Sequence, residues 1–249
     1  MSFLIGLTAG VFGGLVGLGG GVVLIPLLVG VMKLGHLKAH GASLVALIFT
    51  GTIGAMIYAL HDAVDLTAAA ILAAAAVLPV RWGAQYCCSI QESTLRKVFG
   101  VFLVMISLLL LSKPYLPPFA HLDSGLPRVM VLLAAGAATG FIAGLLGIGG
   151  GAVMITAMVL LTGFDQHTAQ GTSLLAMIPA GVVGAWTHWQ KGQVGKDILH
   201  GLIPGIIMGT IAGAWFAHFL VEPGLRLLFS GILIWTGVRF IFKTKTPTG

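Results

Sequence analysis

The chain of 249 residues is 57% hydrophobic and only 8% charged. Soluble globular domains are about a quarter charged, so this composition excludes a soluble enzyme, a disordered tail and a secreted disulfide scaffold. The net charge of +6 does not indicate a nucleic-acid partner, because the 13 lysines and arginines form no basic cluster. Basic residues scattered through short loops are typical of polytopic membrane proteins, and we therefore predict an all-α fold of membrane-spanning helices.

Two copies of one module follow each other along the chain. Gly14-Leu-Val-Gly-Leu-Gly-Gly-Gly21 recurs as Gly144-Leu-Leu-Gly-Ile-Gly-Gly-Gly151, an offset of 130 residues (144 − 14). The same offset relates Gly41-Ala-Ser-Leu44 to Gly171-Thr-Ser-Leu174. A register held without gaps over about a hundred residues indicates an internal repeat. We predict a first repeat at 1–112, a proline-rich linker at 113–128 and a second repeat at 129–249.

Each copy opens with one long apolar stretch, which is followed by three ordinary spans. In chain order we expect spans at 3–32, 42–60, 67–88 and 97–112, and then at 129–162, 172–190, 198–220 and 226–242. A helix needs about 20 residues to cross a membrane, so the last three stretches of each copy cross once. The first stretch is too long for one crossing and carries GxGGG at its middle. It forms either one tilted helix or two half-helices that meet at the glycines and return to the same side.

The distribution of basic residues favours the second arrangement, since Lys and Arg favour cytoplasmic loops. A simple crossing puts five basic residues on one side and seven on the other, whereas a re-entrant hairpin puts nine against three. The nine are Lys33, Lys38, Arg96, Lys97, Lys191, Lys196, Arg239, Lys243 and Lys245, and the three are Lys113, Arg128 and Arg226. Each copy then crosses three times, so we predict two inverted repeats with both termini in the cytoplasm.

Inverted repeats of this kind occur in secondary transporters, whose substrate sites lie at broken helices near the membrane midplane. The glycine runs are the broken elements here, and we expect half-helices to begin after them at Val22 and Ala152. Unpaired N–H groups and the helix dipole make such a helix start a site for a small anion. The predicted backbone ligands are Gly19, Gly20, Gly21, Gly149, Gly150 and Gly151. Gly10, Gly14 and Gly17 instead have the spacing of helix-packing glycines.

Side chains near these segments complete the predicted substrate site. Ser43 and Ser173 occupy equivalent positions in the two copies, and Thr172 precedes Ser173 in the second copy only. Their hydroxyls can either cap a helix or donate to a ligand. Arg81 lies within an expected span, where a charge is costly and commonly functional. Its guanidinium either binds the anion or extends to the cytoplasmic interface.

His188 and Tyr58 occupy equivalent positions of the two copies, and we consider them for a proton relay because histidine titrates near neutral pH. His188 also lies between two tryptophans, which favours an interfacial belt of aromatic rings. Cys87 and Cys88 are adjacent, and we interpret them as apolar fillers. No pair of His or Cys has metal-ligand spacing and no Walker motif indicates ATP use. We therefore expect neither a metal nor a cofactor.

Together these motifs resemble the TauE/SafE family of sulfite and sulfonate exporters, also called the toluene-sulfonate uptake permease family. The resemblance covers nearly the whole chain and rests on Gly14-Leu-Val-Gly-Leu-Gly-Gly-Gly-Val-Val-Leu-Ile-Pro26, His40-Gly-Ala-Ser-Leu44, Gly144-Leu-Leu-Gly-Ile-Gly-Gly-Gly151, Gly171-Thr-Ser-Leu-Leu-Ala-Met-Ile-Pro179, Gly184-Ala185 and Lys191-Gly-Gln-Val194. It implies a bacterial inner-membrane transporter of sulfite, sulfonates or related organic anions. The two copies differ at two prolines, because Thr156 stands at the equivalent of Pro26 and Phe49 at that of Pro179.

We therefore expect a multi-pass protein of the bacterial inner membrane that moves small sulfur-containing oxyanions by alternating access and is not an enzyme. Its expected partners are a small anionic substrate and the lipid bilayer, with no nucleic acid. Proton coupling and assembly into a homo-oligomer stay open. An anion channel with the same site is the first alternative. An intramembrane enzyme is the second, and it would need a nucleophile–base pair or metal ligands that the sequence does not offer.

Overall fold

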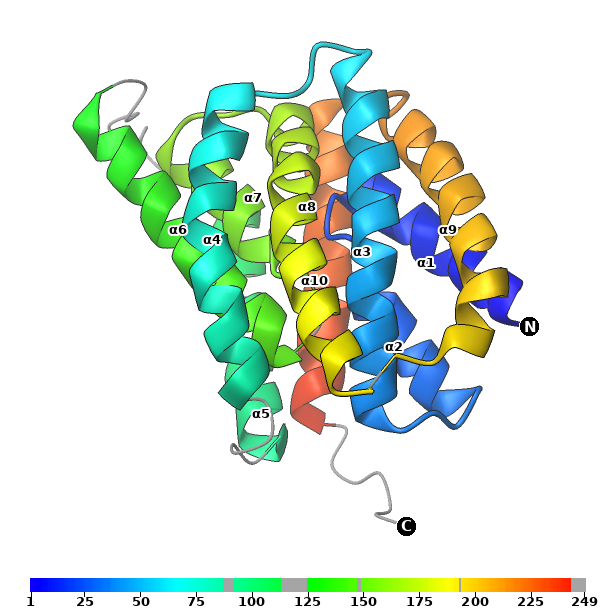
Figure 1. Cartoon of the computed structure of the whole chain (residues 1–249). Coiled ribbons are helices and arrows are strands. Elements are labelled where there is room, and N and C mark those ends of the chain that lie inside the picture. The colour runs from blue at the N-terminus through cyan, green and yellow to red at the C-terminus, as the bar shows by residue number, and fades with distance from the viewer. Residues whose placement is uncertain (87–91, 113–124, 147–148, 193, 243–249) are drawn as a thin grey trace.

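A computed structural model of the chain describes residues 1–86, 92–112, 125–146, 149–192 and 194–242. Over these ranges the chain forms ten α-helices and no strand, as predicted (Figure 1). The helices are α1 (Ser2–Val16), α2 (Gly21–Gly30), α3 (His36–Ala59), α4 (Leu66–Tyr86), α5 (Glu92–Ser112), α6 (Leu126–Leu146), α7 (Gly151–Leu161), α8 (Gln166–Gln190), α9 (Lys196–Ala217) and α10 (Glu222–Phe242). Cys87, Cys88 and most of the predicted linker lie outside the described residues.

The 130-residue offset reappears in the helix boundaries. It relates the first residues of α2 and α7, of α3 and α8, of α4 and α9, and of α5 and α10. Each half of the chain therefore contributes five helices in the same order. The predicted linker at 113–128 overlaps α6, which begins at Leu126. Pro127 and Arg128 lie in the first turn of this helix, where the missing N–H of a proline costs no hydrogen bond.

Within the described residues, five helices are long and apolar enough to cross a membrane, judged by length and composition. They are α3, α4, α6, α9 and α10, over Leu37–Ala59, Leu66–Tyr86, Leu126–Leu145, Ile198–Ala217 and Glu222–Phe242. Four of these agree with expected ordinary spans, and part of α5, Leu103–Ser112, is a shorter apolar segment. The span expected at 172–190 corresponds to α8, which is not among the five. Glutamine, threonine and histidine side chains make α8 more polar, and four of them, Gln166, Gln170, Thr172 and His188, are buried inside the bundle.

The long first stretch of each copy is an interrupted helix. α1 and α2 have 15 and 10 residues, whereas α6 and α7 have 21 and 11. Since a crossing helix needs about 20 residues, only α6 among these four has the length to cross. The two copies therefore differ in their first helix, although the interruption falls at the same position in both.

Glycines allow α1 and α9 to touch backbone to backbone. A methyl group added at Gly10 would lie 2.5 Å from the carbonyl oxygen of Ile206, and one at Gly14 would lie 2.6 Å from that of Thr210. Residue numbers rise together along the two helices, which therefore run parallel. Gly136 of α6 approaches α4 in the same way. The packing role predicted for Gly10 and Gly14 is confirmed, and each half of the chain packs its first helix against the other half.

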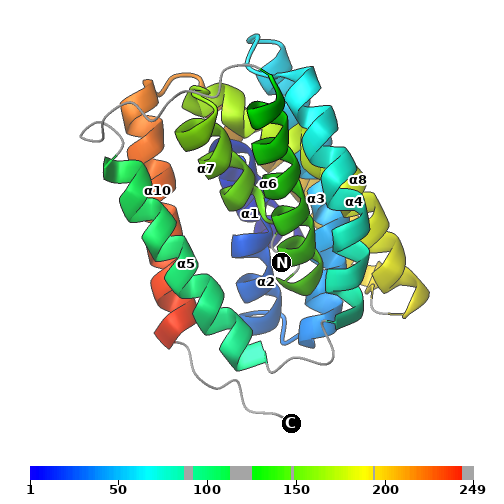
Figure 2. The same cartoon turned by 90° about the vertical axis from the view of Figure 1, so that its left-hand side faces the viewer.

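Equivalent helices of the two halves pack against each other in antiparallel fashion. α3 and α8 lie side by side at the centre of the bundle (Figure 1). A methyl group added at Gly51 of α3 would lie 2.9 Å from the carbonyl oxygen of Leu174, and one at Gly181 of α8 would lie 3.5 Å from that of Leu44. Later residues of α3 thus face earlier residues of α8. α5 and α10 form a second antiparallel pair at one side of the bundle (Figure 2).

Candidate functional site

Two backbone breaks separate α1 from α2 and α6 from α7. In the first break Gly19 and Gly20 have φ angles of 78° and 73°, and in the second Gly149 and Gly150 have φ angles of 89° and 60°. Residues with a Cβ rarely adopt this left-handed conformation, which explains the glycine at all four positions. The interruptions predicted at the glycine runs are therefore confirmed. Gly17, with φ of 74°, caps the end of α1 in the same conformation, and it also packs closely against Gln170 of α8, as its predicted packing role requires.

At the helix starts after the breaks, the first N–H groups have no partner within their own helix. α2 and α7 begin at Gly21 and Gly151, one residue before the predicted Val22 and Ala152, and neither start has a side-chain cap. The N–H groups of these four residues precede the first intrahelical hydrogen bond of their helices. The helix dipole adds partial positive charge at the same end. Each start therefore has the chemistry that binds a small anion.

The two breaks touch each other inside the bundle. A methyl group added at Gly149 would lie 2.8 Å from the carbonyl oxygen of Leu18, and one at Gly151 would lie 2.9 Å from that of Gly17. The glycines of both runs are buried. The start of α2, from the first half of the chain, and the start of α7, from the second half, therefore lie in the same buried region.

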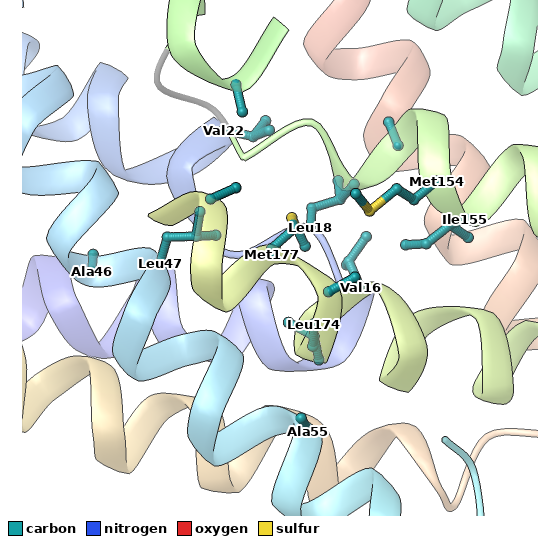
Figure 3. Packing of buried hydrophobic residues seen from close by; sticks show 14 of the residues in the cluster. Val16, Leu18, Val22, Ala46, Leu47, Ala55, Met154, Ile155, Leu174 and Met177 are labelled. Carbon is teal, nitrogen blue, oxygen red and sulfur yellow. The ribbon is translucent and has the colours of Figure 1, made fainter. Parts of the chain in front are cut away.

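Apolar side chains cover this region in the conformation described. Leu47 of α3 and Met177 of α8 lie near Leu18 at the breaks (Figure 3). A methyl group at Gly149 would lie 3.1 Å from Leu47 Cδ1 and 3.6 Å from Met177 Sδ. Leu47 and Met177 occupy equivalent positions of the two copies and are 2% and 1% exposed. An anion can therefore reach the helix starts only after these side chains move.

Ser173 lies at the first break. Its Oγ is 2.9 Å from the carbonyl oxygen of Gly17 and 3.1 Å from that of Gln170. A hydroxyl has one hydrogen, so Ser173 can donate to a ligand only when it releases these carbonyls. Ser43, its equivalent on α3, is also buried. Both predicted serines are thus on the two central helices, α3 and α8.

Thr172 contacts the start of α4, whereas Ser173 contacts the glycine break. Its Oγ1 accepts a hydrogen bond from the backbone N–H of Asp65 at 2.9 Å. The Asp65 carboxylate in turn accepts from the N–H of Ala68 at 2.8 Å and forms an ion pair with Arg128 at 2.7 Å. The structure therefore brings Thr172 to the start of α4, whereas the neighbouring Ser173 lies at the glycine break.

Arg81 lies on the exposed side of α4. Val80, Gly83 and Ala84 are the buried residues around it and form the face that packs inside the bundle. This placement favours the alternative in which the guanidinium extends to the membrane interface. The structure does not bring Arg81 into the interior face of its helix.

Tyr58 and His188, the two residues considered for a proton relay, are both buried but lie far apart. The Tyr58 hydroxyl donates to Gln170 Oε1 at 2.8 Å and lies 3.2 Å from the carbonyl oxygen of Gly14. His188 follows Gln170 by 18 residues on the same helix (188 − 170). At about 1.5 Å per residue this is roughly 27 Å, so the structure does not place the two side chains in one contact.

Gln170 and a group of three histidines were not predicted from the sequence as site residues. Gln170 is fully buried, and its Nε2 has no hydrogen-bond partner among the described residues. Its position directly before Gly171-Thr-Ser173, a motif shared by both copies, was the available signal. The three histidines are His61, His167 and His218. No group of three or more His, Cys, Asp or Glu in the described ranges could hold a metal ion.

Comparison with known proteins places the chain in a family. It matches the family described as Sulfite exporter TauE/SafE over residues 2–246. It is 29% identical to the probable membrane transporter protein YunE of Bacillus subtilis, over 98% of both chains. It is 28% identical to a probable membrane transporter protein of Xylella fastidiosa (strain Temecula1), over 97% of this chain and 92% of the other. No solved structure matches the chain. Since the family match spans nearly every residue, the chain belongs to the TauE/SafE family of sulfite exporters.

Proposed function

We propose that the protein is a secondary transporter of the bacterial inner membrane that moves small sulfur-containing oxyanions, such as sulfite or sulfonates, by alternating access. The contact between the two glycine breaks carries this proposal, because each break precedes an uncapped helix start. The description of the family names a sulfite exporter, and both relatives named above are described as probable membrane transporters. The proposal includes no catalytic step.

Backbone groups supply the binding chemistry in this proposal. The oxygens of a sulfite or sulfonate accept hydrogen bonds from the N–H groups of Gly21, Val22, Gly151 and Ala152. Two helix dipoles balance the negative charge without a buried cationic side chain. The Ser173 hydroxyl adds a donor when it releases the Gly17 carbonyl. This chemistry suits a chain in which 8% of the residues are charged.

Alternating access in this proposal follows from two inverted repeats, 1–112 and 129–249. The antiparallel pairing of α3 with α8 and of α5 with α10 supports inversion, because helices related by the 130-residue offset then point in opposite directions. In this proposal each half opens with a re-entrant hairpin, so the chain returns through α7 to the side from which α6 started, although α6 alone is long enough to cross. The excess of basic residues puts both termini in the cytoplasm. Movement of Leu47 and Met177 away from the breaks then opens the site to one side of the membrane at a time.

Uptake of labelled sulfite or a sulfonate into proteoliposomes tests the proposal. The wild-type protein should accumulate the anion above its external concentration when an ion gradient is imposed. Uptake that only equalises the two concentrations would instead identify an anion channel. A protein that passes neither sulfite nor sulfonates would contradict the proposed substrate class.

The Gly151→Ala variant tests the contact between the two breaks, because the added methyl group would lie 2.9 Å from both the Gly17 carbonyl oxygen and Met177 Cε while the backbone N–H is kept. We expect uptake to fall by on the order of tenfold, equivalent to about 1.4 kcal/mol. Gly30→Ala is the matched control, since nothing lies within 4 Å of its added methyl group. Normal uptake by a folded Gly151→Ala protein would contradict the proposal that the close contact between the breaks forms the anion site.

A further inference from the structure

Three histidines from three helices meet at one end of the bundle. The rings of His61 and His218 stack with centroids 3.9 Å apart at an angle of 25°, and the ring of His167 lies 5.5 Å from that of His218. His61 follows α3, His167 is in the first turn of α8, and His218 directly follows α9. We call these three residues the histidine cluster.

Each ring of the histidine cluster uses one nitrogen to bind a backbone carbonyl. The contacts are His61 Nδ1 to Ile57 O at 2.9 Å, His218 Nδ1 to Ala214 O at 2.8 Å, and His167 Nε2 to Ala217 O at 3.1 Å. A carbonyl oxygen only accepts, so each of these nitrogens carries a hydrogen. The second nitrogen of each neutral ring is then an acceptor that can take up a proton.

A continuous set of contacts joins the histidine cluster to the first glycine break. The Tyr58 ring lies 4.7 Å from the His218 ring, and the Tyr58 hydroxyl donates to Gln170 Oε1. Gln170 packs against Gly17, where an added methyl group would lie 2.8 Å from the Gln170 Cβ. His218 directly follows α9, and α9 packs along α1. Since α1 ends at the same glycine break, the two helices form a second connection. A change at the cluster can therefore reach the proposed anion site through two routes.

The charges of the rings in the histidine cluster influence one another. Two protonated rings at these separations repel each other. Burial lowers the pKa of His218 below its ordinary value, the hydrogen bond to Ala214 partly offsets this, and the nearby His61 and His167 lower it further. The other charged groups on the elements that meet here are Asp62, Asp65 with Arg128, Asp165, and Glu222 with Arg226. Of these, Asp165 interacts with the charge of His167.

Protonation also changes the hydrogen-bond partner that the His218 ring requires. Its Nε2 is buried and has no hydrogen-bond partner in the described part of the chain. In a neutral ring this nitrogen is a buried acceptor without a partner. In a protonated ring it would be a donor of a charged group without a partner, which costs more free energy. A proton on the stacked pair therefore favours a conformation in which the ends of α3 and α9 separate.

We propose that the histidine cluster binds the proton that is coupled to anion transport. This rests on the transport function proposed above. One ring nitrogen takes a proton from the solution at the end of the bundle where residues 60–65 lie, which is the external side in the proposed topology. The protonated cluster favours opening at that side, and loss of the proton restores the closed packing around Tyr58.

The test compares two fluxes in proteoliposomes. The first is uptake of labelled sulfite driven by a pH gradient, and the second is exchange of labelled for unlabelled sulfite at equal pH. The His61→Asn/His218→Asn double variant keeps a side-chain amide that can donate to Ile57 and Ala214 but cannot titrate. We expect it to lose the stimulation by the pH gradient and to retain exchange. His200→Asn, at an exposed position of α9, is the matched control and should retain both.

Unchanged stimulation by the pH gradient in the double variant would overturn the assignment. Loss of both fluxes in a folded double variant would also overturn it, because the histidines would then be needed for binding or packing. His61→Asn alone changes an exposed residue and should reduce the stimulation even if the double variant does not fold. Absence of any flux in the wild-type protein would refute the transport function itself, which distinguishes that failure from failure of the proton site.

Discussion

The Tyr58 hydroxyl donates a hydrogen bond to Gln170 Oε1 at 2.8 Å, and both side chains are fully buried. This bond joins α3 of the first half to α8 of the second half beside the first glycine break. On one side the Tyr58 ring touches His218, and on the other Gln170 packs against Gly17. The pair therefore lies between the histidine cluster and the proposed anion site.

Replacing Tyr58 with phenylalanine should destabilise the protein by about 1–3 kcal/mol, because Gln170 Oε1 would lose its partner while buried. Chemical denaturation in detergent micelles would measure the free energy of unfolding. Tyr58→Phe combined with Gln170→Leu should be less destabilised than the single variant, since both polar partners are then removed. A single variant as stable as the wild type would show that the bond contributes nothing.

Replacing Gly10 with alanine should destabilise the contact between α1 and α9. The added methyl group would lie 2.5 Å from the Ile206 carbonyl oxygen, so the helices must separate. We expect a loss of about 1–3 kcal/mol, as for other overpacked sites, measured by thermal unfolding in detergent. Gly231→Ala in α10 is the control, because no atom lies within 4 Å of its methyl group. Equal melting temperatures for the two variants would contradict the close packing.

Cysteines at Val31 and Leu161 test the inverted topology. Val31 directly follows α2 and Leu161 is the last residue of α7. The two positions differ by the repeat offset (161 − 31 = 130) and are 44% and 42% exposed. A thiol reagent that cannot cross the membrane should label Val31→Cys only from the cytoplasm and Leu161→Cys only from outside. Labelling of both from the same side would refute the inversion, and their matched exposure makes the comparison direct.

The pKa of His218 predicts how stability depends on pH. Since this pKa is lower in the folded protein than its ordinary value of about 6.5, the unfolded chain binds more protons between the two values. Stability should therefore fall as the pH decreases below about 6.5. The melting temperature of His218→Asn, measured across this range, should decline less than that of the wild type. Identical declines would assign the effect to other groups.

The repeat and the position of its interruptions could be predicted from the sequence. Gly19 and Gly149 mark breaks that the structure confirms, because only a glycine run adopts the left-handed backbone there at low cost. Apolar segments also predicted most of the long helices. The span expected at 172–190 lies within α8, which begins six residues earlier and whose buried polar side chains lower its hydropathy.

The arrangement of side chains around the breaks could not be predicted in the same way. Thr172 and Ser173 are neighbours in the chain, yet consecutive residues of a helix point about 100° apart. One therefore contacts Asp65 and the other Gly17. Likewise, His61 and His218 come together only because the ends of α3 and α9 meet, which no local pattern specifies.

The pairing of α1 with α9 has a consequence for biosynthesis. Gly10 meets Ile206, a residue made 196 positions later (206 − 10), so at about 5–20 residues per second the partner of α1 arrives roughly 10–40 s after it. α6, in contrast, finds α4 already synthesised. A nascent chain that stops before α9 keeps the glycine face of its first helix unpaired, so the final assembly of the first half must wait until most of the second half has left the ribosome.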